Sequence, residues 1–189
     1  MKLPIVKYGD PILRAKGKRI ERVDERVRSL AANMLETMHA ANGVGLAAQQ
    51  VSEALQLTII DVAGVEDRPS TMKLNGLDVD PRTSMPLILL NPRLSFGKAT
   101  ILGSEGCLSF PVITGEIMRA ESVVASADTI EGEAITIEAT GLLARALQHE
   151  VDHLNGILFI DRMSSATKAT LARQLKRLQK ETQLHYSAL

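Results

Sequence analysis

The sequence predicts a single α+β domain, built mostly of antiparallel β-sheets that pack around a central helix, with a further helix at the C-terminal end. The 189 residues suffice to bury one hydrophobic core, and no linker, repeat or low-complexity tract divides residues 1–189. Short apolar runs bounded by turn residues predict strands between residues 57 and 139. Apolar residues at helical spacing predict helices at 24–39, 141–156 and 164–184.

The first helix is expected to begin after Asp24, a favourable N-cap residue, and to end near His39. Its apolar face is formed by Val27, Leu30, Ala31, Met34, Leu35 and Met38. Residues 8–11 (YGDP), ahead of it, predict a turn. We interpret His39 as a partly exposed side chain at a helix C-terminus, where a cation is favourable, rather than as a metal ligand.

Residues 43–51 (GVGLAAQQV) combine two glycines with small side chains, which lets the backbone run close to another part of the molecule. A tight corner between a helix and a strand explains the run equally well. A phosphate-binding loop is excluded because no Gly-Lys-Ser/Thr follows. A buried strand is expected next, at residues 57–62.

Residues 63–86 are interrupted by Gly and Pro and show little apolar periodicity. Because this segment exceeds the usual ~12–15 residues of a structureless loop, we expect either a functional flap or a family-variable loop insertion. A strand is expected at residues 87–90, before an Asn-Pro pair that ends it. Two more are expected at residues 122–126 and 135–139, with a glycine-containing turn between them.

The central helix carries His149, Glu150 and His153. Four residues apart on a helix, the two imidazoles share one face, with Cβ atoms about 5–6 Å apart, close enough to bind one metal ion. Glu150 is then placed to take a proton from water without being a ligand. Thr140 is a plausible N-cap and Gly156 a plausible left-handed stop. The alternative is a core helix with two hydrogen-bonded histidines and a surface glutamate, and this pattern alone leaves both open.

A metal site with two histidines needs a third ligand. In some metalloproteases a third histidine follows at a fixed spacing, but that position is Phe159 here. The remaining soft or imidazole candidates are Cys107, His39 and His185. Cys107 stands among Gly, Ser and Glu, where a thiolate can reach a metal, although a buried cysteine is more often a small apolar side chain.

The composition excludes several classes of function. The 22 Lys and Arg match the 22 Asp and Glu, so the zero net charge argues against binding of DNA or of a membrane surface through bulk charge. Aromatic residues are only 3%, so a stacking platform for bases is not expected. No apolar run approaches the ~20 residues of a membrane span, and no signal or transit peptide is recognisable. A single cysteine suits a reducing compartment, so we expect a cytoplasmic protein.

Three stretches together resemble the motifs of the peptide deformylase family, in that family's order: residues 43–50 (GVGLAAQQ), 105–109 (EGCLS) and 148–153 (QHEVDH). The flanking residues 7–11 and 154–162 agree as well, so the resemblance covers nearly the whole chain. Each motif alone is ambiguous, but their conjunction is specific. The resemblance implies removal of the formyl group from the N-terminal formyl-methionine of newly made bacterial proteins. The rival interpretations are another His-Glu-x-x-His metallohydrolase, such as a small protease, and a non-catalytic metal-stabilised module.

The resemblance also implies a role for each motif residue. It implies one divalent metal per chain, ordinarily Fe(II), with Zn(II) or Ni(II) able to substitute, bound by Cys107, His149 and His153. It makes Glu150 the general acid/base, with the Gln50 side chain and the Leu108 backbone N–H holding the oxyanion. Substrate-binding residues would be Gly43, Val44, Gly45 and Gly106 beside the peptide, and Ala146, whose small side chain leaves room for methionine.

Two features depart from the family's commonest pattern. The segment 63–86 is longer than in short family members. No arginine lies between Ser109 and Arg119, where some members carry one that helps to hold the substrate. Both departures bear on substrate preference, and the metal chemistry is unaffected.

The C-terminal helix, expected from Ser164 or Ser165 to about Gln183, combines two stripes. Its apolar stripe is Leu171, Leu175 and Leu178, and its basic stripe is Arg173, Arg177 and Lys180. From Ser164 onward five Lys/Arg face one acid, which leaves 17 basic and 21 acidic residues before it. An ordinary solvated face is one interpretation. The other is a weak, salt-sensitive contact with ribosomal RNA, since a deformylase must meet chains leaving the ribosome.

Overall fold

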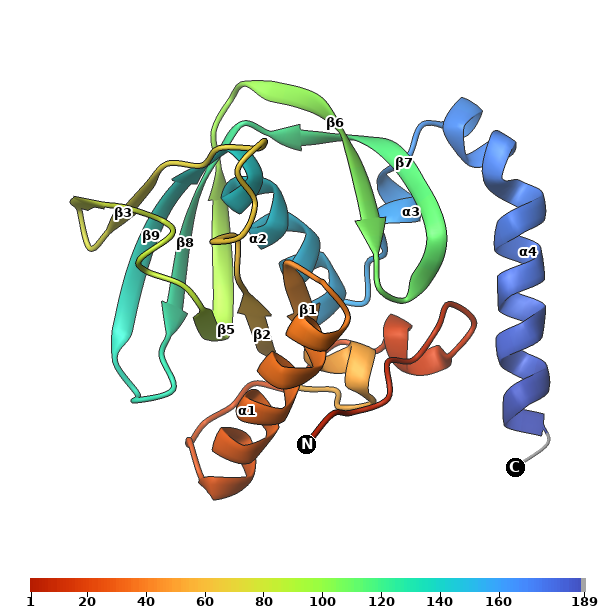
Figure 1. The fold of residues 1–189 in the computed structure, drawn as a ribbon, viewed down its shortest axis with the longest axis horizontal. Helices are drawn as coiled ribbons and strands as arrows, with labels where there is room; N and C mark the ends of the chain where they lie inside the picture. The colour runs from red at the N-terminus through yellow and green to blue at the C-terminus, as the bar shows by residue number, and fades with distance from the viewer. Residues whose placement is uncertain (188–189) are drawn as a thin grey trace.

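The computed structural model describes the backbone of residues 1–187 and the side chains of residues 1–184 (Figure 1). Its helical elements are η1 (Pro11–Arg14), α1 (Glu25–Ala40), η2 (Ala48–Val51), α2 (Gly141–Leu154), α3 (Phe159–Arg162) and α4 (Ser165–Ser187). Its strands are β1 (Gly45–Ala47), β2 (Leu57–Ile60), β3 (Met72–Leu74), β4 (Leu77–Val79), β5 (Leu87–Phe96), β6 (Thr100–Cys107), β7 (Phe110–Ala120), β8 (Ser122–Asp128) and β9 (Ala134–Thr140).

Two antiparallel sheets form the β part of the fold. Seven strands make one sheet in the order β1-β2-β5-β8-β9-β3-β4, and β6 pairs with β7 in a separate long hairpin. The helix α2 lies between the sheet and this hairpin (Figure 1). The predicted α+β class, with antiparallel strands around a central helix, is therefore confirmed.

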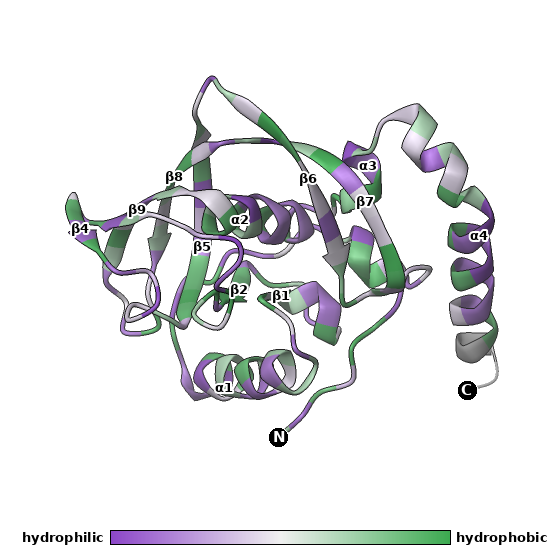
Figure 2. Ribbon diagram, turned by 45° about the horizontal axis from the view of Figure 1, so that its top comes forward, coloured by the Kyte–Doolittle hydropathy of each residue, from purple (hydrophilic) through white to green (hydrophobic). Residues whose placement is uncertain are grey.

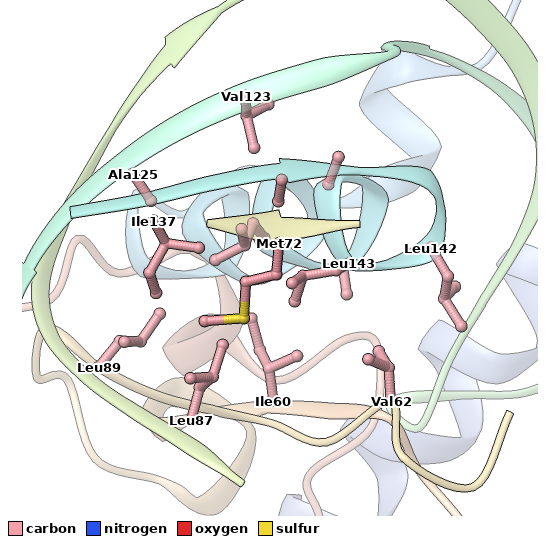
Figure 3. Packing of buried hydrophobic residues seen from close by; sticks show 14 of the residues in the cluster. Ile60, Val62, Met72, Leu87, Leu89, Val123, Ala125, Ile137, Leu142 and Leu143 are labelled. Atoms are coloured by element: carbon pink, nitrogen blue, oxygen red, sulfur yellow. The ribbon is translucent and has the colours of Figure 1, made fainter. Parts of the chain in front are cut away.

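The interior side of the large sheet packs on α2. Figure 3 shows Leu142 and Leu143 of the helix among apolar side chains of the strands. Twelve of the 14 residues of α2 are buried, so this helix needs polar partners as well as apolar ones. Its apolar residues face the sheet, whereas its buried Arg145, His149 and Asp152 have polar partners on the β6–β7 hairpin. The fold therefore places charged chemistry on one flank of an otherwise buried helix.

The two outer helices show the periodicity that the sequence predicts. Figure 2 shows hydrophilic and hydrophobic residues alternating along α1 and α4. Asp24 caps α1, because its side chain accepts a hydrogen bond from the Val27 N–H (2.9 Å). Ser164 caps α4 in the same way, from the Thr167 N–H (3.1 Å). In the described part of the chain, no helix has both the length and the apolar character that crossing a bilayer requires.

The segment 63–86 is more ordered than its sequence suggests. It contains the β3–β4 hairpin, whose turn residues Asn75 (φ 51°) and Gly76 (φ 82°) both take the left-handed conformation. β3 pairs in turn with β9, so the hairpin extends the large sheet. The segment predicted as a flap or loop insertion therefore contains two strands that the sequence did not predict. Two short strands joined by Asn-Gly contain too few apolar positions to show the two-residue alternation that predicts a strand.

The same segment caps the start of α2. The Ser70 hydroxyl accepts a hydrogen bond from the Leu143 N–H (2.9 Å), and the Pro69 carbonyl accepts one from the Leu142 N–H (3.4 Å). Thr140 occupies the N-cap position as predicted, but its side chain makes no capping bond and instead pairs with the Thr71 hydroxyl (2.6 Å). Residues distant in sequence therefore satisfy the free N–H groups of the central helix.

Other strand boundaries also differ from expectation. β5 continues past Asn91-Pro92 to Phe96, because a shift of register between Leu90 and Arg93 carries the strand past the proline. The strands expected at residues 122–126 and 135–139 are present and slightly longer. β6 and β7, the longest hairpin, were not predicted. Gly156 takes the left-handed conformation (φ 73°) beyond the end of α2, as expected.

Candidate metal centre and active site

Three side chains that can bind a metal converge beside α2. The ligand atoms of Cys107, His149 and His153 all lie within 4.8 Å of one another. Cys107 ends β6, and its Sγ lies 3.3 Å from His153 Nε2. The two histidines stand one turn apart on α2, with ring centroids separated by 5.0 Å. The structure thus places Cys107, at the end of β6, beside the face of α2 that carries His149 and His153.

The other sequence candidates lie elsewhere. His39 is half exposed and its Nε2 lies 2.8 Å from an Asp61 carboxylate oxygen, so it is not part of this group. The side chain of His185 lies outside the described residues. Phe159, at the position of the third histidine of some metalloproteases, packs against the His149 ring with centroids 5.9 Å apart. It contributes a wall of the site and no ligand.

The donor set fits a divalent transition metal. One cysteine sulfur and two imidazole nitrogens suit zinc or ferrous iron, and three protein ligands leave a coordination position open, as catalytic sites require. Burial lowers the pKa of His153 well below its usual value, so the ring is held neutral, the form that binds a metal. These residues can therefore hold one such ion.

A buried carboxylate orients the first histidine. Glu105 Oε2 lies 2.9 Å from His149 Nδ1, which leaves Nε2 as the ligand atom. Glu105 also accepts hydrogen bonds from Arg119 Nε (2.8 Å) and Arg145 Nη1 (2.9 Å). Although burial opposes ionisation, the hydrogen bonds from His149 and Arg119 hold the pKa of Glu105 below its usual range. Glu105 is therefore a charged hub of the site.

The network reaches the far end of α2. Arg119 Nη1 donates to Asp152 Oδ2 (2.6 Å), and Arg162 Nη2 donates to Asp152 Oδ1 (2.7 Å). Sequence reasoning did not assign a role to Glu105, Arg119, Arg145 or Asp152. A signal was present: Arg145, His149 and Asp152 are spaced i, i+4 and i+7, which puts three polar side chains on one face of an apolar helix.

Glu150 lies buried beside the metal-binding residues and is 4% exposed. Its Oε2 has no hydrogen-bond partner among the described residues. Burial raises the pKa of this carboxyl to about 7, a value suited to exchanging protons near neutrality. A buried carboxylate oxygen without a protein partner is costly, which is consistent with an atom that faces a reacting water.

The position of Gly45 explains why the stretch 43–51 needs a glycine there. A Cβ placed on this residue would lie 2.3 Å from Glu150 Oε1, so only glycine lets β1 pass over the carboxylate. The predicted close approach of the backbone in residues 43–51 is thus present, against the side chain of the central helix. Gln50, at the end of the motif, is fixed by its Oε1, which accepts from the Ala47 N–H (2.9 Å). Its Nε2 is directed toward Ser109 Oγ (3.2 Å) and Cys107 Sγ (3.5 Å).

A cleft of about 510 Å³ opens over these groups. It is lined by every residue that the resemblance assigned to substrate or oxyanion, namely Gly43, Val44, Gly45, Gln50, Gly106, Leu108 and Ala146. Cys107, His149 and Glu150 line it as well, whereas His153 lies beneath, 1% exposed. The cleft therefore connects the metal-binding residues with solvent. Arg68 and Lys7 also line it, and neither was predicted to do so.

Comparison with known proteins accounts for this arrangement. A model of the polypeptide deformylase family matches residues 2–169. The chain belongs to the peptide deformylase family. A peptide deformylase of Opitutus terrae is 43% identical over 184 residues, covering 96% of this chain and 95% of that protein. Among solved structures, a plant peptide deformylase 1B matches with a TM-score of 0.85 at 37% identity, covering 99% of this chain and 94% of that one. The peptide deformylase of Thermus thermophilus matches with a TM-score of 0.80 at 34% identity, covering 96% and 99%.

Membership of this family makes the chain an enzyme: a metal-dependent hydrolase that removes N-terminal formyl groups in protein biosynthesis. Family membership therefore favours a deformylase over the two rival interpretations, a small protease and a non-catalytic metal-stabilised module.

We predict that Gly45→Ala lowers kcat/KM for a formyl-peptide by about 100-fold, because the added methyl group must displace Glu150 by roughly an ångström. The measurement is steady-state kinetics together with metal content. Gly64→Ala is the control, since nothing lies within 4 Å of a Cβ there. Equal activity of the two variants would contradict the role given to the Gly45–Glu150 contact.

We predict that Glu105→Gln destabilises the fold by about 3–5 kcal/mol, because it leaves Arg119 and Arg145 buried without their shared anion. Metal affinity should fall about 10- to 100-fold as His149 loses its partner. Urea unfolding and metal competition measure the two effects. Glu116→Gln, an exposed site on β7, should change neither, and similar behaviour of both variants would refute the assignment.

Proposed function

We propose that the chain hydrolyses the formamide bond of N-terminal formyl-methionine on newly made polypeptides, with Cys107, His149 and His153 holding one divalent metal ion. The observation that carries this proposal is the convergence of their ligand atoms and the unpartnered carboxylate of Glu150 at the base of one cleft. Such an ion supplies Lewis acidity, which makes water a nucleophile at neutral pH and polarises the formyl carbonyl.

Glu150 moves the protons in this reaction. Its carboxylate accepts a proton from the attacking water, whose oxygen forms a bond to the formyl carbon. The same group then delivers the proton to the amine nitrogen as the carbon–nitrogen bond breaks, which yields formate and a free methionine N-terminus. A carboxyl with a pKa near 7 is suited to both steps.

Two donors are available for the oxyanion that develops on the formyl oxygen. The Gln50 amide is held with its Nε2 toward the Cys107 sulfur, and Leu108 directly follows that cysteine at the mouth of the cleft. We assign oxyanion binding to the Gln50 side chain and the Leu108 backbone N–H. Removing one such donor typically costs about 10²–10³ in rate.

The substrate peptide is proposed to lie along β1. This strand is an edge of the seven-stranded sheet. Among the described residues it pairs only with β2, through residues 45–47, so its other edge can accept an added strand. Gly43, Val44 and Gly106 border the same space. Ala146 lines the cleft and carries a small side chain, which leaves room for the methionine side chain.

Fe(II) is proposed as the physiological metal, with Zn(II) or Ni(II) as substitutes, and the cytoplasm, where chains leave the ribosome, as the compartment. One thiolate among the ligands fits all three ions. It also makes the iron form sensitive to oxidation, since a thiolate beside a redox-active ion is itself readily oxidised.

The proposal predicts that Glu150→Ala abolishes hydrolysis of a formyl-Met peptide while metal content stays close to one ion per chain. Glu150 transfers protons and is not a ligand, so the site keeps its three donors. His149→Ala is the comparison and should lose the metal. Metal loss from the Glu150 variant, measured by elemental analysis, would overturn the assignment.

For the metal, we expect the iron-loaded enzyme to lose activity in air while the nickel- or zinc-loaded enzyme survives much longer. Anaerobic purification, reconstitution with each ion and timed exposure to oxygen provide the test. Equal half-lives for the iron and nickel forms would speak against a ferrous ion beside the Cys107 thiolate.

The C-terminal helix is proposed to dock weakly on ribosomal RNA. Its apolar stripe packs inward, with Leu175 buried and Leu171 and Leu178 beside the same cluster. Its basic stripe, Arg173, Arg177 and Lys180, is exposed, and Arg177 makes only an exposed pair with Glu181. Backbone phosphates would bind such a stripe without base specificity.

Replacing Arg173, Arg177 and Lys180 with Gln is expected to weaken salt-sensitive co-sedimentation with ribosomes while leaving activity on free formyl-peptides unchanged. The matched control replaces Arg22, Arg28 and Lys98, which are exposed elsewhere on the molecule, with Gln. If both triple variants bind ribosomes like the unmodified chain, or if binding is insensitive to salt, the docking proposal fails.

A further inference from the structure

Arg68 occupies an unexpected place at the cleft. It belongs to the segment 63–86, yet its exposed side chain lines the same cleft as the metal-binding residues. Its Nη2 lies 3.5 Å from the Ser104 carbonyl oxygen of β6, a long contact that leaves most of its N–H donors available. A guanidinium with one long contact to the protein thus lines the cleft.

The backbone that carries Arg68 is anchored to α2. The two residues that follow it cap the helix through the Pro69 carbonyl and the Ser70 hydroxyl. Gly141 is needed for this docking, because a Cβ there would lie 2.0 Å from the Pro69 oxygen. The same helix bears His149, Glu150 and His153, so the Arg68 backbone is fixed relative to the reacting centre. The fold therefore fixes the position of the Arg68 backbone at the cleft.

The charged side chains that lie near solvent in the cleft are cationic. Its acidic lining residues, Glu105 and Glu150, are buried, and Glu105 is neutralised by arginines. The charged groups nearer to solvent are Arg68 and the half-buried Lys7, whose Nζ donates to the Leu108 carbonyl (2.9 Å). Among the described residues, no exposed acidic side chain lines the cleft. Glu66 and Asp80 line a second hollow, which Arg68 also borders, and neither of these acids lines the cleft.

The spacing along β6 indicates which part of a peptide meets Arg68. Ser104, which the guanidinium contacts, precedes Cys107 by three residues. At about 3.3 Å per residue of extended chain this is roughly 10 Å from the metal-binding cysteine. A substrate that enters formyl group first and lies extended between β1 and β6, with its chain running toward Ser104, would advance at the same rate. Its second and third residues therefore come within reach of the long Arg68 side chain.

We propose that Arg68 is a specificity-determining residue that favours nascent chains with an acidic side chain at the second or third position. This inference rests on the deformylation proposed above and adds to it a preference by charge. The pair would be partly exposed, so its contribution is modest and sensitive to salt. Arg68 touches only the peptide beyond methionine, so it acts on substrate binding and leaves the chemical step unchanged.

The test compares formyl-Met-Ala-X-Ala and formyl-Met-X-Ala-Ala peptides with X as Glu, Gln or Lys. In at least one series kcat/KM should be about two- to five-fold higher for Glu than for Gln at low ionic strength, and lower for Lys. The difference should lie in KM and should shrink as salt is added. Arg68→Gln should remove the preference and leave kcat on the Gln peptide unchanged.

Arg82→Gln is the matched control. Arg82 lies in the same segment, pairs with Asp80 and does not line the cleft, so this variant should keep the preference. No preference in the unmodified enzyme, or a preference that survives Arg68→Gln, overturns the role of Arg68 while deformylation stands. Failure of the metal-loaded enzyme to hydrolyse any of these formyl-peptides overturns the proposed function as well.

Discussion

The buried carboxylate of Glu105 joins the two elements that supply the proposed metal ligands. Cys107 comes from the β6–β7 hairpin and the histidines from α2. Glu105 binds across this boundary: its neighbours are His149 and Arg145 on the helix and Arg119 on β7. An ion pair buried this deeply contributes little net stability compared with apolar packing, because its desolvation offsets the attraction. Its value lies in fixing where the hairpin stands relative to the helix.

The need to hold the hairpin in a fixed position relative to α2 explains why this helix carries so many buried polar residues. Gln148 adds hydrogen bonds to both the N–H (3.0 Å) and the carbonyl (2.9 Å) of Ala120 at the end of β7. Asp152 receives Arg119 and Arg162. One flank of the helix makes these bonds and the other packs on the apolar core. Among the described residues of α2, Glu150 Oε2 and His153 Nδ1 are the buried side-chain polar atoms that have no hydrogen-bond partner. The Glu150 carboxylate, the proposed proton carrier, is thus held by packing from Gly45 on β1 as well as from its own helix.

The parts of this structure that the sequence predicts are those governed by neighbours along the chain. Asp24 and Ser164 cap the helices they precede, and the four-residue spacing of the histidines sets their shared face. The cap of α2 was not predictable, because Ser70 lies about seventy residues before the helix that it caps. The β6–β7 hairpin was missed because it lacks the alternating apolar pattern of a half-buried sheet: Ile101 and Leu102, adjacent in β6, are both exposed. The hub role of Glu105 depends on arginines from two other elements, and only the fold brings these together.

We propose that one cysteine and two histidines, held in place by Glu105, bind the metal. X-ray absorption spectroscopy of the zinc-loaded protein tests this ligand set. We expect one sulfur neighbour at about 2.3 Å and two imidazole nitrogens at about 2.0–2.1 Å, with the sulfur signal lost in Cys107→Ser. A first shell without sulfur, or a spectrum unchanged by that substitution, would contradict it.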